Sequence, residues 1–264
     1  MPVVKAGNVE LSYERSGSGP PLLLIMGLSG SMLHWGEPFL QALRHDFELI
    51  AYDNRGVGAS SRVEAPFSIA DMAADAAGLM AALELESAHL LGISMGGMVA
   101  QELALAHPER IRTLTLGCTY CGGPGNALPA QPELGAAVMS GDRERALRAA
   151  WEANVSAHFA QDAGAYAAFR AIGQERSVAV AVMMEQLSAI TRHDTSSRLG
   201  ALKMPTLVVH GSEDRIIPVE HGRIVAGLIP GARLEILQDI GHLFFWELPE
   251  RSAELVREHA LVHA

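Results

Sequence analysis

The stretch Gly92-Ile93-Ser94-Met95-Gly96 constrains the local fold more than any other part of this chain. The apolar run before it, at 88–91, is typical of a buried strand, and the run after it, at 97–107, contains no proline and is typical of a helix. The serine therefore lies on a strand-to-helix turn, and a glycine two residues away on each side leaves room for a very tight one. We expect Ser94 to adopt a strained backbone conformation there.

This turn predicts a reactive serine. The Gly-x-Ser-x-Gly pattern in a strand–turn–helix context is a nucleophile elbow, which holds the serine hydroxyl clear of the chain. The N-terminus of the following helix offers free N–H groups and partial positive charge, which suit an oxyanion. Because the chain has 26 glycines, the pattern could also arise without a function. The interpretation therefore depends on partner residues farther along the chain.

Composition excludes several classes of protein. The chain has 264 residues and is 49% hydrophobic, which suits one large α/β domain or a domain with an insertion. Its formal net charge of −10 argues against nucleic acid and against an anionic membrane as partners, and leaves a small-molecule substrate. We find no apolar run of about 18 residues, so no transmembrane helix is expected. The N-terminus lacks the apolar core of a signal peptide, which predicts a cytoplasmic protein.

The two cysteines, Cys118 and Cys121, are spaced C-x2-C and enter a loop rich in glycine and proline. A zinc site would need two further ligands at matching spacing, and no second cysteine pair exists. We interpret them as two reduced thiols near a loop. The sequence therefore predicts neither a metal nor an organic cofactor.

Strand-like and helix-like segments alternate over most of the chain. The expected strands are 3–5, 9–14, 21–26, 47–52, 88–92, 111–116, 204–210 and 232–237, with a loop at 15–20. The helices expected among them are 35–45, 69–83, 97–107, 219–228 and 248–262. This alternation predicts an α/β fold built on a mostly parallel, doubly wound sheet of eight strands.

The alternation is interrupted between residues 122 and 199. After a loop at 121–132, Ala-rich segments at 141–160, 164–172 and 177–191 predict helices, and no strand-like run occurs among them. We expect residues 122–199 to form an all-helical lid on an α/β core made of residues 1–121 and 200–264. Such insertions usually cover the edge of the sheet where ligands bind. Five large side chains are expected to line the pocket or to pack the lid onto the core: Trp151, Phe159, Tyr166, Met183 and Met184.

A nucleophilic serine needs a base, and the base needs a third group that holds its tautomer. His242 is the best base among eleven histidines because it lies in a loop directly after the last strand. Asp214 is the best acid because it lies in the turn after the strand at 204–210, with Glu213 and Asp239 as local alternatives. The order Ser94, Asp214, His242 is the order found in α/β-hydrolases.

The other histidines have structural interpretations. His210 lies within an expected strand and is expected to be buried. His107, His259 and His263 are expected at helix ends or on exposed faces. His242 is therefore the only histidine placed at the site.

The chain resembles the α/β-hydrolase superfamily over essentially its full length. The matching pieces are YDNRGVGAS at 52–60, GISMGG at 92–97, GSED at 211–214 and Gly241-His242 followed by ELPE at 247–250. It is most similar to the branch that holds 3-oxoadipate enol-lactonases, cofactor-free haloperoxidases (perhydrolases) and carboxylesterases. The resemblance implies Ser94 as nucleophile, His242 as base and Asp214 as acid.

The chain departs from the family pattern after the third expected strand. Many relatives have His-Gly there, and this chain has Met26-Gly27. Because the donors of an oxyanion hole are backbone N–H groups, loss of the histidine does not remove the hole. By position, we expect the N–H groups of Leu28 and Met95 to supply it. The loop at 53–60 is expected to be structural, with Arg55 joining loops by ion pairing or by hydrogen bonds to the backbone.

These residues predict a serine hydrolase that cleaves a small or medium carboxylic ester, thioester or lactone through an acyl-enzyme. The same three residues suit hydrolysis of a C–C bond in a vinylogous diketone, and also perhydrolysis, in which peroxide replaces water. A further interpretation is a ligand receptor of the same fold with slow turnover. The sequence leaves open the acyl and alcohol groups and the oligomeric state, for which a homodimer is one option.

Overall fold

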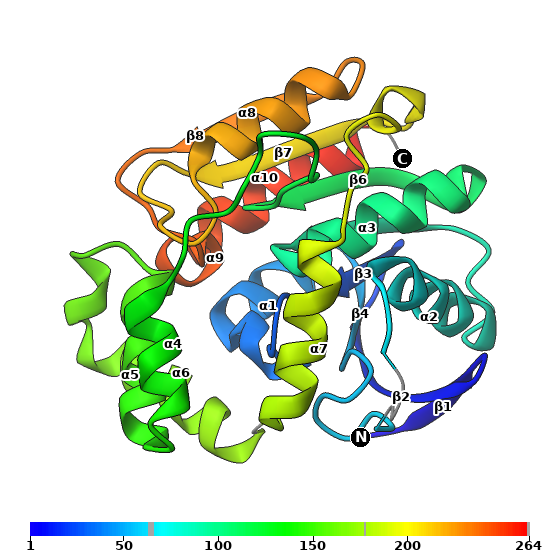
Figure 1. The fold of residues 1–264 in the computed structure, drawn as a ribbon. Coiled ribbons are helices and arrows are strands. Elements are labelled where there is room, and N and C mark those ends of the chain that lie inside the picture. Colours follow the sequence, from blue (N-terminus) through cyan, green and yellow to red (C-terminus); the bar gives the residue numbers. More distant parts are fainter. Residues whose placement is uncertain (63–65, 177, 263–264) are drawn as a thin grey trace.

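The computed structural model describes residues 1–62, 66–176 and 178–262. Its strands form one eight-stranded sheet in the order β1-β2-β4-β3-β5-β6-β7-β8 (Figure 1). All neighbouring strands pair in parallel except β1 with β2 and β2 with β4. The mostly parallel eight-stranded sheet is thus confirmed. The strands are β1 Val3–Ala6, β2 Val9–Gly17, β3 Pro21–Ile25, β4 Glu48–Tyr52, β5 Ala88–Ile93, β6 Ile111–Gly117, β7 Thr206–Gly211 and β8 Arg233–Leu237.

Strand β2 is longer than the sequence predicts. Its last residues pair with β4, so that Arg15 lies opposite Ile50 and Gly17 opposite Glu48. The Arg15 guanidinium also pairs with the Glu48 carboxylate at 2.7 Å. Residues 15–17, which were expected to begin a loop, therefore belong to β2. The composition of the segment does not reveal that β4 supplies hydrogen-bond partners for its backbone.

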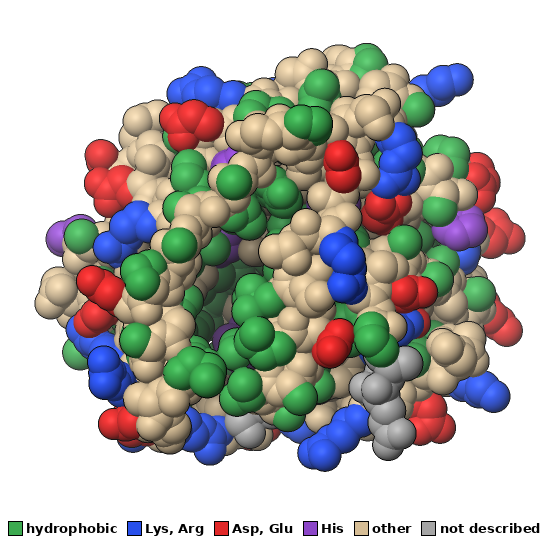
Figure 2. Space-filling model, in the orientation of Figure 1, with side chains coloured by type: hydrophobic (Ala, Val, Ile, Leu, Met, Phe, Trp, Pro, Cys, Tyr) green, Lys and Arg blue, Asp and Glu red, His purple; other side chains and the backbone are tan. Residues whose placement is uncertain are grey.

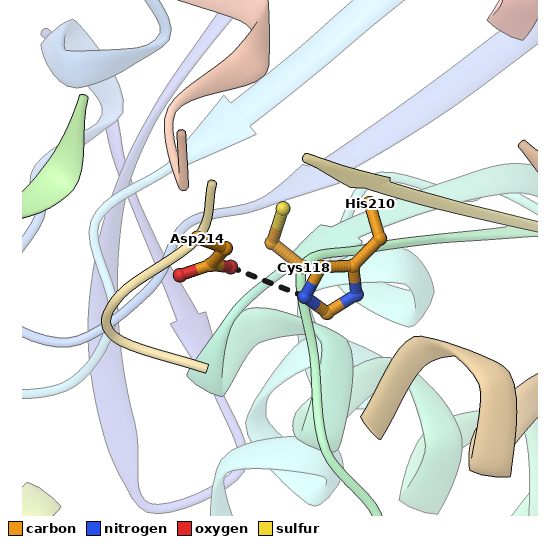
Figure 3. A group of neighbouring side chains, drawn as sticks. All are labelled: Cys118, His210 and Asp214. Carbon is orange, nitrogen blue, oxygen red and sulfur yellow. Dashed lines mark ion pairs between the residues drawn. The ribbon is translucent and has the colours of Figure 1, made fainter. Parts of the chain in front are cut away.

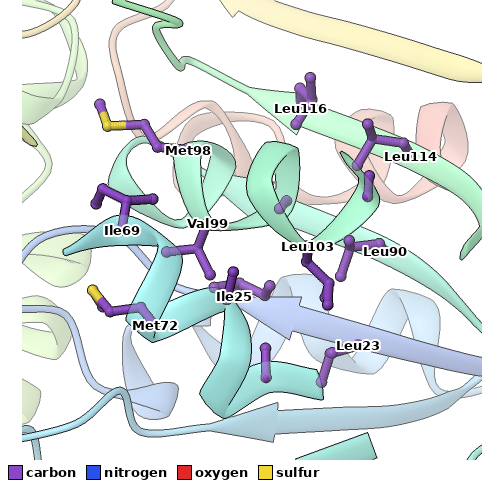
Figure 4. Close-up of a cluster of buried hydrophobic side chains, with 14 of the residues drawn as sticks. Leu23, Ile25, Ile69, Met72, Leu90, Met98, Val99, Leu103, Leu114 and Leu116 are labelled. Atoms are coloured by element: carbon purple, nitrogen blue, oxygen red, sulfur yellow. The ribbon is translucent and has the colours of Figure 1, made fainter. Parts of the chain in front are cut away.

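Helices cover both faces of the sheet. On one face lie α2 (Ile69–Ala82), α3 (Met95–Ala106) and α8 (Val219–Leu228), and on the other lie α1 (Glu37–Leu43), α9 (Phe244–Glu247) and α10 (Pro249–Leu261). Successive residues of β3 point to opposite faces: Leu23 packs under α2 and α3, as Figure 4 shows, whereas Leu24 packs toward α1 and α10. A strand buried on both faces explains the continuous apolar run in the sequence.

Between β6 and β7 the described residues form helices and no strand. The helices are α4 (Pro132–Met139), α5 (Arg143–Asn154), α6 (Ala163–Glu175) and α7 (Val180–Thr191). The all-helical insertion is thus confirmed, and its boundaries at 122 and 199 stay a prediction. Helix α4 was not expected. The expected start of the last helix, at Ser177, lies outside the described residues.

Helix α5 ends earlier than the sequence predicts, at Asn154 instead of residue 160. Val155, which follows it, has an extended backbone. The Asn154 carbonyl accepts a hydrogen bond from the Leu243 N–H at 2.8 Å. Continuing the helix would turn this carbonyl toward its own chain, so a contact with a distant segment ends α5.

Figure 2 shows a hollow in the molecular surface between α4 and α7. Hydrophobic side chains surround this hollow (Figure 2). The exposed apolar side chains of α4 and α7 include Met139 at 75%, Met184 at 53% and Val180 at 51%. Trp151, in contrast, is fully buried and packs against Phe169 within the lid. Trp151 also meets the Trp246 ring of α9, at 5.9 Å between centres. Of the expected pocket residues, Trp151 therefore packs the lid onto the core, and Met184 lies on the surface.

Arg55 forms a buried ion pair, as the sequence analysis expected. Its Nε and Nη2 donate to the two carboxylate oxygens of Asp75, on α2, at 2.6 and 2.7 Å. The guanidinium also lies over the Phe67 ring, 5.3 Å from its centre. A planar donor pair that meets both oxygens of a carboxylate fixes the loop that carries Arg55 against α2.

We expect the substitution Asp75→Asn to lower the free energy of unfolding by about 3–5 kcal/mol, because it leaves the guanidinium buried without its counter-charge. Urea denaturation at pH 7 measures the loss. The control is Glu37→Gln, which breaks an exposed ion pair with Arg44 and should cost less than about 1 kcal/mol. Equal losses in the two variants would contradict the prediction.

Two further expectations concern the C-terminal part of the chain. His259 lies in the last turn of α10, at a helix end as expected, and its side chain is buried. His263 lies outside the described residues. Within the part of the chain that the structure describes, no helix combines the length and the apolar character needed to cross a membrane.

Candidate active site

Ser94 lies where β5 ends and α3 begins. Its backbone angles are φ 56° and ψ −124°, which confirms the strained turn that the glycine pattern predicts. Such a conformation costs about 1–3 kcal/mol in a residue other than glycine. A Cβ atom on Gly92 would collide with the Gly96 carbonyl, and one on Gly96 would collide with the Ile25 carbonyl. Both glycines are therefore needed to bring β3, β5 and α3 this close together.

Hydrogen bonds hold the strained turn in place. The Ser94 N–H donates to the Gly117 carbonyl at 2.9 Å, and the Thr119 hydroxyl donates to the Ser94 carbonyl at 2.7 Å. Gly117 ends β6 and Thr119 follows it. The strand next to β5 thus fixes the backbone on both sides of the Ser94 side chain.

Asp214 and His242 form a hydrogen-bonded pair beyond the ends of β7 and β8. The distance from His242 Nδ1 to Asp214 Oδ2 is 2.7 Å, and both side chains are buried. The other carboxylate oxygen, Oδ1, accepts the backbone N–H groups of Ile216 and Ile217, both at 2.9 Å. Because an ionised carboxylate only accepts hydrogen bonds, Nδ1 carries the proton in neutral His242 and Nε2 is left free to act as a base.

A second histidine reaches the same carboxylate. Figure 3 shows His210 Nε2 pointing at Asp214, with 3.2 Å between Nε2 and Oδ2. Burial by itself raises the pKa of the Asp214 carboxyl, but the charge of His242 and hydrogen bonds from His210 and His242 outweigh burial and hold this pKa below its usual range. Asp214 is therefore ionised at neutral pH.

Cys118, His210 and Asp214 together have the residue types of a metal site, with ligand atoms within 4.8 Å of one another. Most of their polar atoms are already engaged: both oxygens of Asp214 as described, and His210 Nε2 with the Ile217 carbonyl at 2.7 Å. Burial and the neighbouring Asp214 raise the pKa of the Cys118 thiol well above its usual value, which keeps it protonated. We interpret Cys118 and His210 as side chains that pack around the Asp214 carboxylate and support it.

The alternative acids are not placed like Asp214. Glu213 and Asp239 are exposed, and neither contacts His242 among the described residues. Asp239 instead has a positive φ of 60° and uses its N–H to bind the Ser212 hydroxyl. Within the described residues, the structure brings Asp214 alone among the three acids to His242.

The loop after β3 runs beside Ser94. A Cβ atom on Gly27 would lie 3.0 Å from Ser94 Cβ and 3.5 Å from Ser94 Oγ. The next N–H group belongs to Leu28, and Met95 is the first residue of α3. Among the described residues, neither of these N–H groups has a protein acceptor. Their use as oxyanion donors stays a prediction, as does a hydrogen bond between Ser94 and His242, which the described residues do not show; such bonds often tighten only when substrate is bound.

Asp53 and Asn54 hold this loop from the core side. The Asn54 side-chain amide donates to the Met26 carbonyl at 3.0 Å, and Asp53 Oδ1 accepts the Met32 N–H at 2.8 Å. Both residues are buried. Their side chains fix the loop that carries Leu28, which agrees with the structural role expected of the loop at 53–60.

Glu247 is a residue whose place in the site was not foreseen. Its Oε1 accepts the N–H groups of Gly241 and Ser156 at 2.8 and 2.9 Å, and its Oε2 accepts the Ser156 hydroxyl at 2.6 Å. One carboxylate thus joins the lid, directly after α5, to the residue that precedes His242. The only signal in the sequence is the ELPE piece of the family resemblance, which gives no contact.

His34 lies where α6 of the lid meets the core, a position that the sequence does not predict. Burial lowers the pKa of its imidazole to about 4, so the ring is neutral at pH 7. Its Nδ1 accepts the Ser31 N–H at 3.1 Å, which leaves the proton on Nε2. The ring also meets Phe169 of α6 edge-on, at 5.6 Å between centres. A neutral hydrogen-bond donor therefore lies where the lid meets the core.

A separate hollow of about 550 Å³ lies between α4 and α5. It is lined by residues such as Ala136, Arg145 and Glu152, and by none of the candidate site residues. A second hollow, of about 360 Å³, is lined by Asp214 and its neighbours Ser212–Arg215 together with Ala157. We place the site where Ser94 and the Asp214–His242 pair lie, since the chemistry resides there.

The sheet order, the strained serine turn and the Asp–His pair define the class of protein. The family model described as alpha/beta hydrolase fold matches residues 20–249, and the chain belongs to this family. The protein is therefore a member of the α/β-hydrolase family.

Individual relatives are similar over nearly the whole chain. A protein described as a carbamate hydrolase, RutD, from Azorhizobium caulinodans is 29% identical over 97% of each chain. A poly(3-hydroxyalkanoate) depolymerase from Ectopseudomonas oleovorans is 31% identical over 92% of this chain and 87% of its own. Among solved structures, the esterase RhEst1 from Rhodococcus sp. ECU1013 is 27% identical, with a TM-score of 0.86 over 99% of this chain and 98% of its own.

Proposed function

We propose that the protein is a serine hydrolase that cleaves a small or medium carboxylic ester, thioester or lactone. The observation that carries the proposal is the 2.7 Å hydrogen bond from His242 to Asp214, at the end of the sheet where Ser94 forms a strained strand-to-helix turn. The names of the relatives, a carbamate hydrolase, a polyester depolymerase and an esterase, support attack on an acyl carbon.

The proposed reaction begins with Ser94 Oγ. His242 Nε2 accepts the Ser94 proton while Oγ bonds to the acyl carbon, and Asp214 stabilises the imidazolium that forms. The tetrahedral intermediate collapses when His242 gives this proton to the leaving oxygen or sulfur, which leaves an acyl group on Ser94. Water then attacks this acyl-enzyme with His242 as base again, and the acid is released.

The negative oxygen of the intermediate needs donors that are in place beforehand. We assign this role to the N–H groups of Leu28 and Met95, because Gly27 passes close to Ser94 and Met95 opens α3. The N-terminus of α3 adds partial positive charge at the same point. Loss of one such donor costs other hydrolases about 3–4 kcal/mol of transition-state stabilisation.

The surroundings favour an uncharged, largely apolar substrate. Hydrophobic side chains surround the hollow between α4 and α7 (Figure 2). His34 adds a neutral donor at the boundary between lid and core. A bulky charged acyl group would lose part of its hydration in such apolar surroundings.

Steady-state hydrolysis of p-nitrophenyl esters from acetate to decanoate tests the proposal, with Ser94→Ala as the control. We expect turnover that depends on Ser94 and has its maximum at a short or medium acyl chain. A single burst of p-nitrophenol without further turnover would favour the slow receptor instead. Turnover only of a vinylogous diketone, or only with peroxide in place of water, would replace the proposal by the C–C hydrolase or the perhydrolase.

A further inference from the structure

Gln186 joins the lid to the loop that carries Leu28. It lies on α7, its side chain is completely buried, and its Oε1 accepts the Ser29 N–H at 2.9 Å. Ser29 directly follows Leu28, one of the two proposed oxyanion donors. A side chain from the lid, 157 residues away in sequence, therefore binds the backbone next to the reaction site.

The Ser29 backbone requires such support. Its φ is 56°, in the left-handed region that residues other than glycine seldom adopt. A strained residue persists only where its surroundings hold it in place. The neighbouring Gly30 N–H bonds back to the Gly27 carbonyl at 3.2 Å, and Gln186 fixes the Ser29 N–H.

Fixing the Ser29 N–H also limits the direction of the Leu28 N–H. The Ser29 N–H lies in the peptide plane that begins at Leu28 Cα, and the Leu28 N–H lies in the plane that ends at the same atom. Only the two backbone dihedral angles of Leu28 separate these planes. Holding the plane that contains the Ser29 N–H therefore restrains the plane that contains the Leu28 N–H. The Met26 carbonyl is held independently by Asn54, which anchors the other end of the segment.

Helix α7 itself is closely seated on the core. A Cβ atom on Gly56 would lie 2.7 Å from a Val182 methyl group, and the Arg192 guanidinium donates to the Phe67 carbonyl at 3.1 Å. The side-chain nitrogen of Gln186, Nε2, is buried and has no hydrogen-bond partner among the described residues. The only hydrogen bond of this buried side chain among the described residues is the one that Oε1 accepts from Ser29, so this bond accounts for a glutamine at the position.

We infer that Gln186 is a positioning residue through which the lid sets the oxyanion hole. This inference deepens the proposed function and depends on it. The lid is then part of the catalytic arrangement as well as a wall of the pocket. Moving α7 away from the core would release Ser29 and misdirect the Leu28 N–H, while leaving Ser94, Asp214 and His242 in place.

The test is Gln186→Met, which keeps the length of the side chain and removes the acceptor. We expect kcat for the best p-nitrophenyl ester to fall about 10- to 100-fold with KM changed less than about threefold, since an oxyanion donor acts mainly in the transition state. The inhibition constant of phenylboronic acid, whose tetrahedral serine adduct places an oxygen in the hole, should rise by a similar factor. Gln174→Met, the same change at an exposed lid position, is the matched control and should alter none of these values.

Hydrogen exchange supplies a readout that does not need turnover. Amide exchange in a peptide spanning residues 26–32 should accelerate in Gln186→Met and not in Gln174→Met, measured well below the melting temperature of each variant. Unchanged exchange, or unchanged kcat and boronate affinity, would overturn the inference. Should Gln186→Met not fold, Gln186→Asn, which is too short to reach Ser29, is read in the same way. A wild type without Ser94-dependent turnover would refute the proposed function, and the exchange rates would still decide whether Gln186 holds the loop.

Discussion

Replacement of Ser94 by alanine is expected to abolish hydrolysis. Removal of the nucleophile from a serine hydrolase costs on the order of 10⁶ in kcat, because the base then has no hydroxyl to activate. The fold should persist, since the hydrogen bonds that hold this residue use its backbone N–H and C=O, and alanine keeps both. The strained φ of 56° is as costly for alanine as for serine, so the melting temperature should change little.

The measurement pairs turnover with covalent labelling. A fluorophosphonate should add its mass to the peptide that contains Ser94 in the wild type, and to no peptide of Ser94→Ala. Ser140→Ala, a change of the same size in the lid, is the control and should behave as the wild type. Activity within tenfold of the wild type in Ser94→Ala would show that another group carries the reaction.

The second large effect is expected for Asp214→Asn, which should lower kcat by about 10⁴. The asparagine oxygen is drawn to the N–H groups of Ile216 and Ile217, which now bind Oδ1. Its NH2 group would then take the place of Oδ2 and face His242 Nδ1. A donor there forces the proton of the imidazole onto Nε2, and His242 can no longer accept a proton from Ser94.

Two matched variants separate this effect from a general loss of negative charge. Asp239→Asn and Glu213→Gln remove carboxylates that lie near His242 and Asp214 in sequence but are exposed. Both should keep kcat within about threefold, as surface changes away from the reacting groups commonly do. A large loss of kcat in Asp239→Asn together with a small loss in Asp214→Asn would show that Asp239, and not Asp214, is the acid.

The fold could be predicted from the sequence wherever a segment carries its own signal. The apolar run of β3, buried on both faces, and the glycines around Ser94 are local features, and the structure confirms both. The errors occur where a distant segment decides. Strand β2 continues to Gly17 because β4 pairs with it, and α5 ends at Asn154 because Leu243 binds its last carbonyl.

The candidate site divides in the same way. Asp214 and His242 could be chosen by their positions after strands, because the carboxyl ends of parallel strands meet at one edge of the sheet. Glu247, His34 and Gln186 could not, since each acts through a contact with a segment far away in the chain. The spacing of these residues in the sequence does not predict such contacts.

The sequence by itself determined the order of the strands along the chain, the strained serine and the residue types available for acid and base chemistry. These features depend on backbone preferences and on the spacing of hydrophobic residues, which are set by residues close together in the chain. Only the tertiary structure decided which side chains tie the lid to the loops that carry Leu28 and His242. Those choices depend on hydrogen bonds whose geometry exists only after the chain has packed. A side chain such as Gln186 acquires its place at the site from the fold that surrounds it.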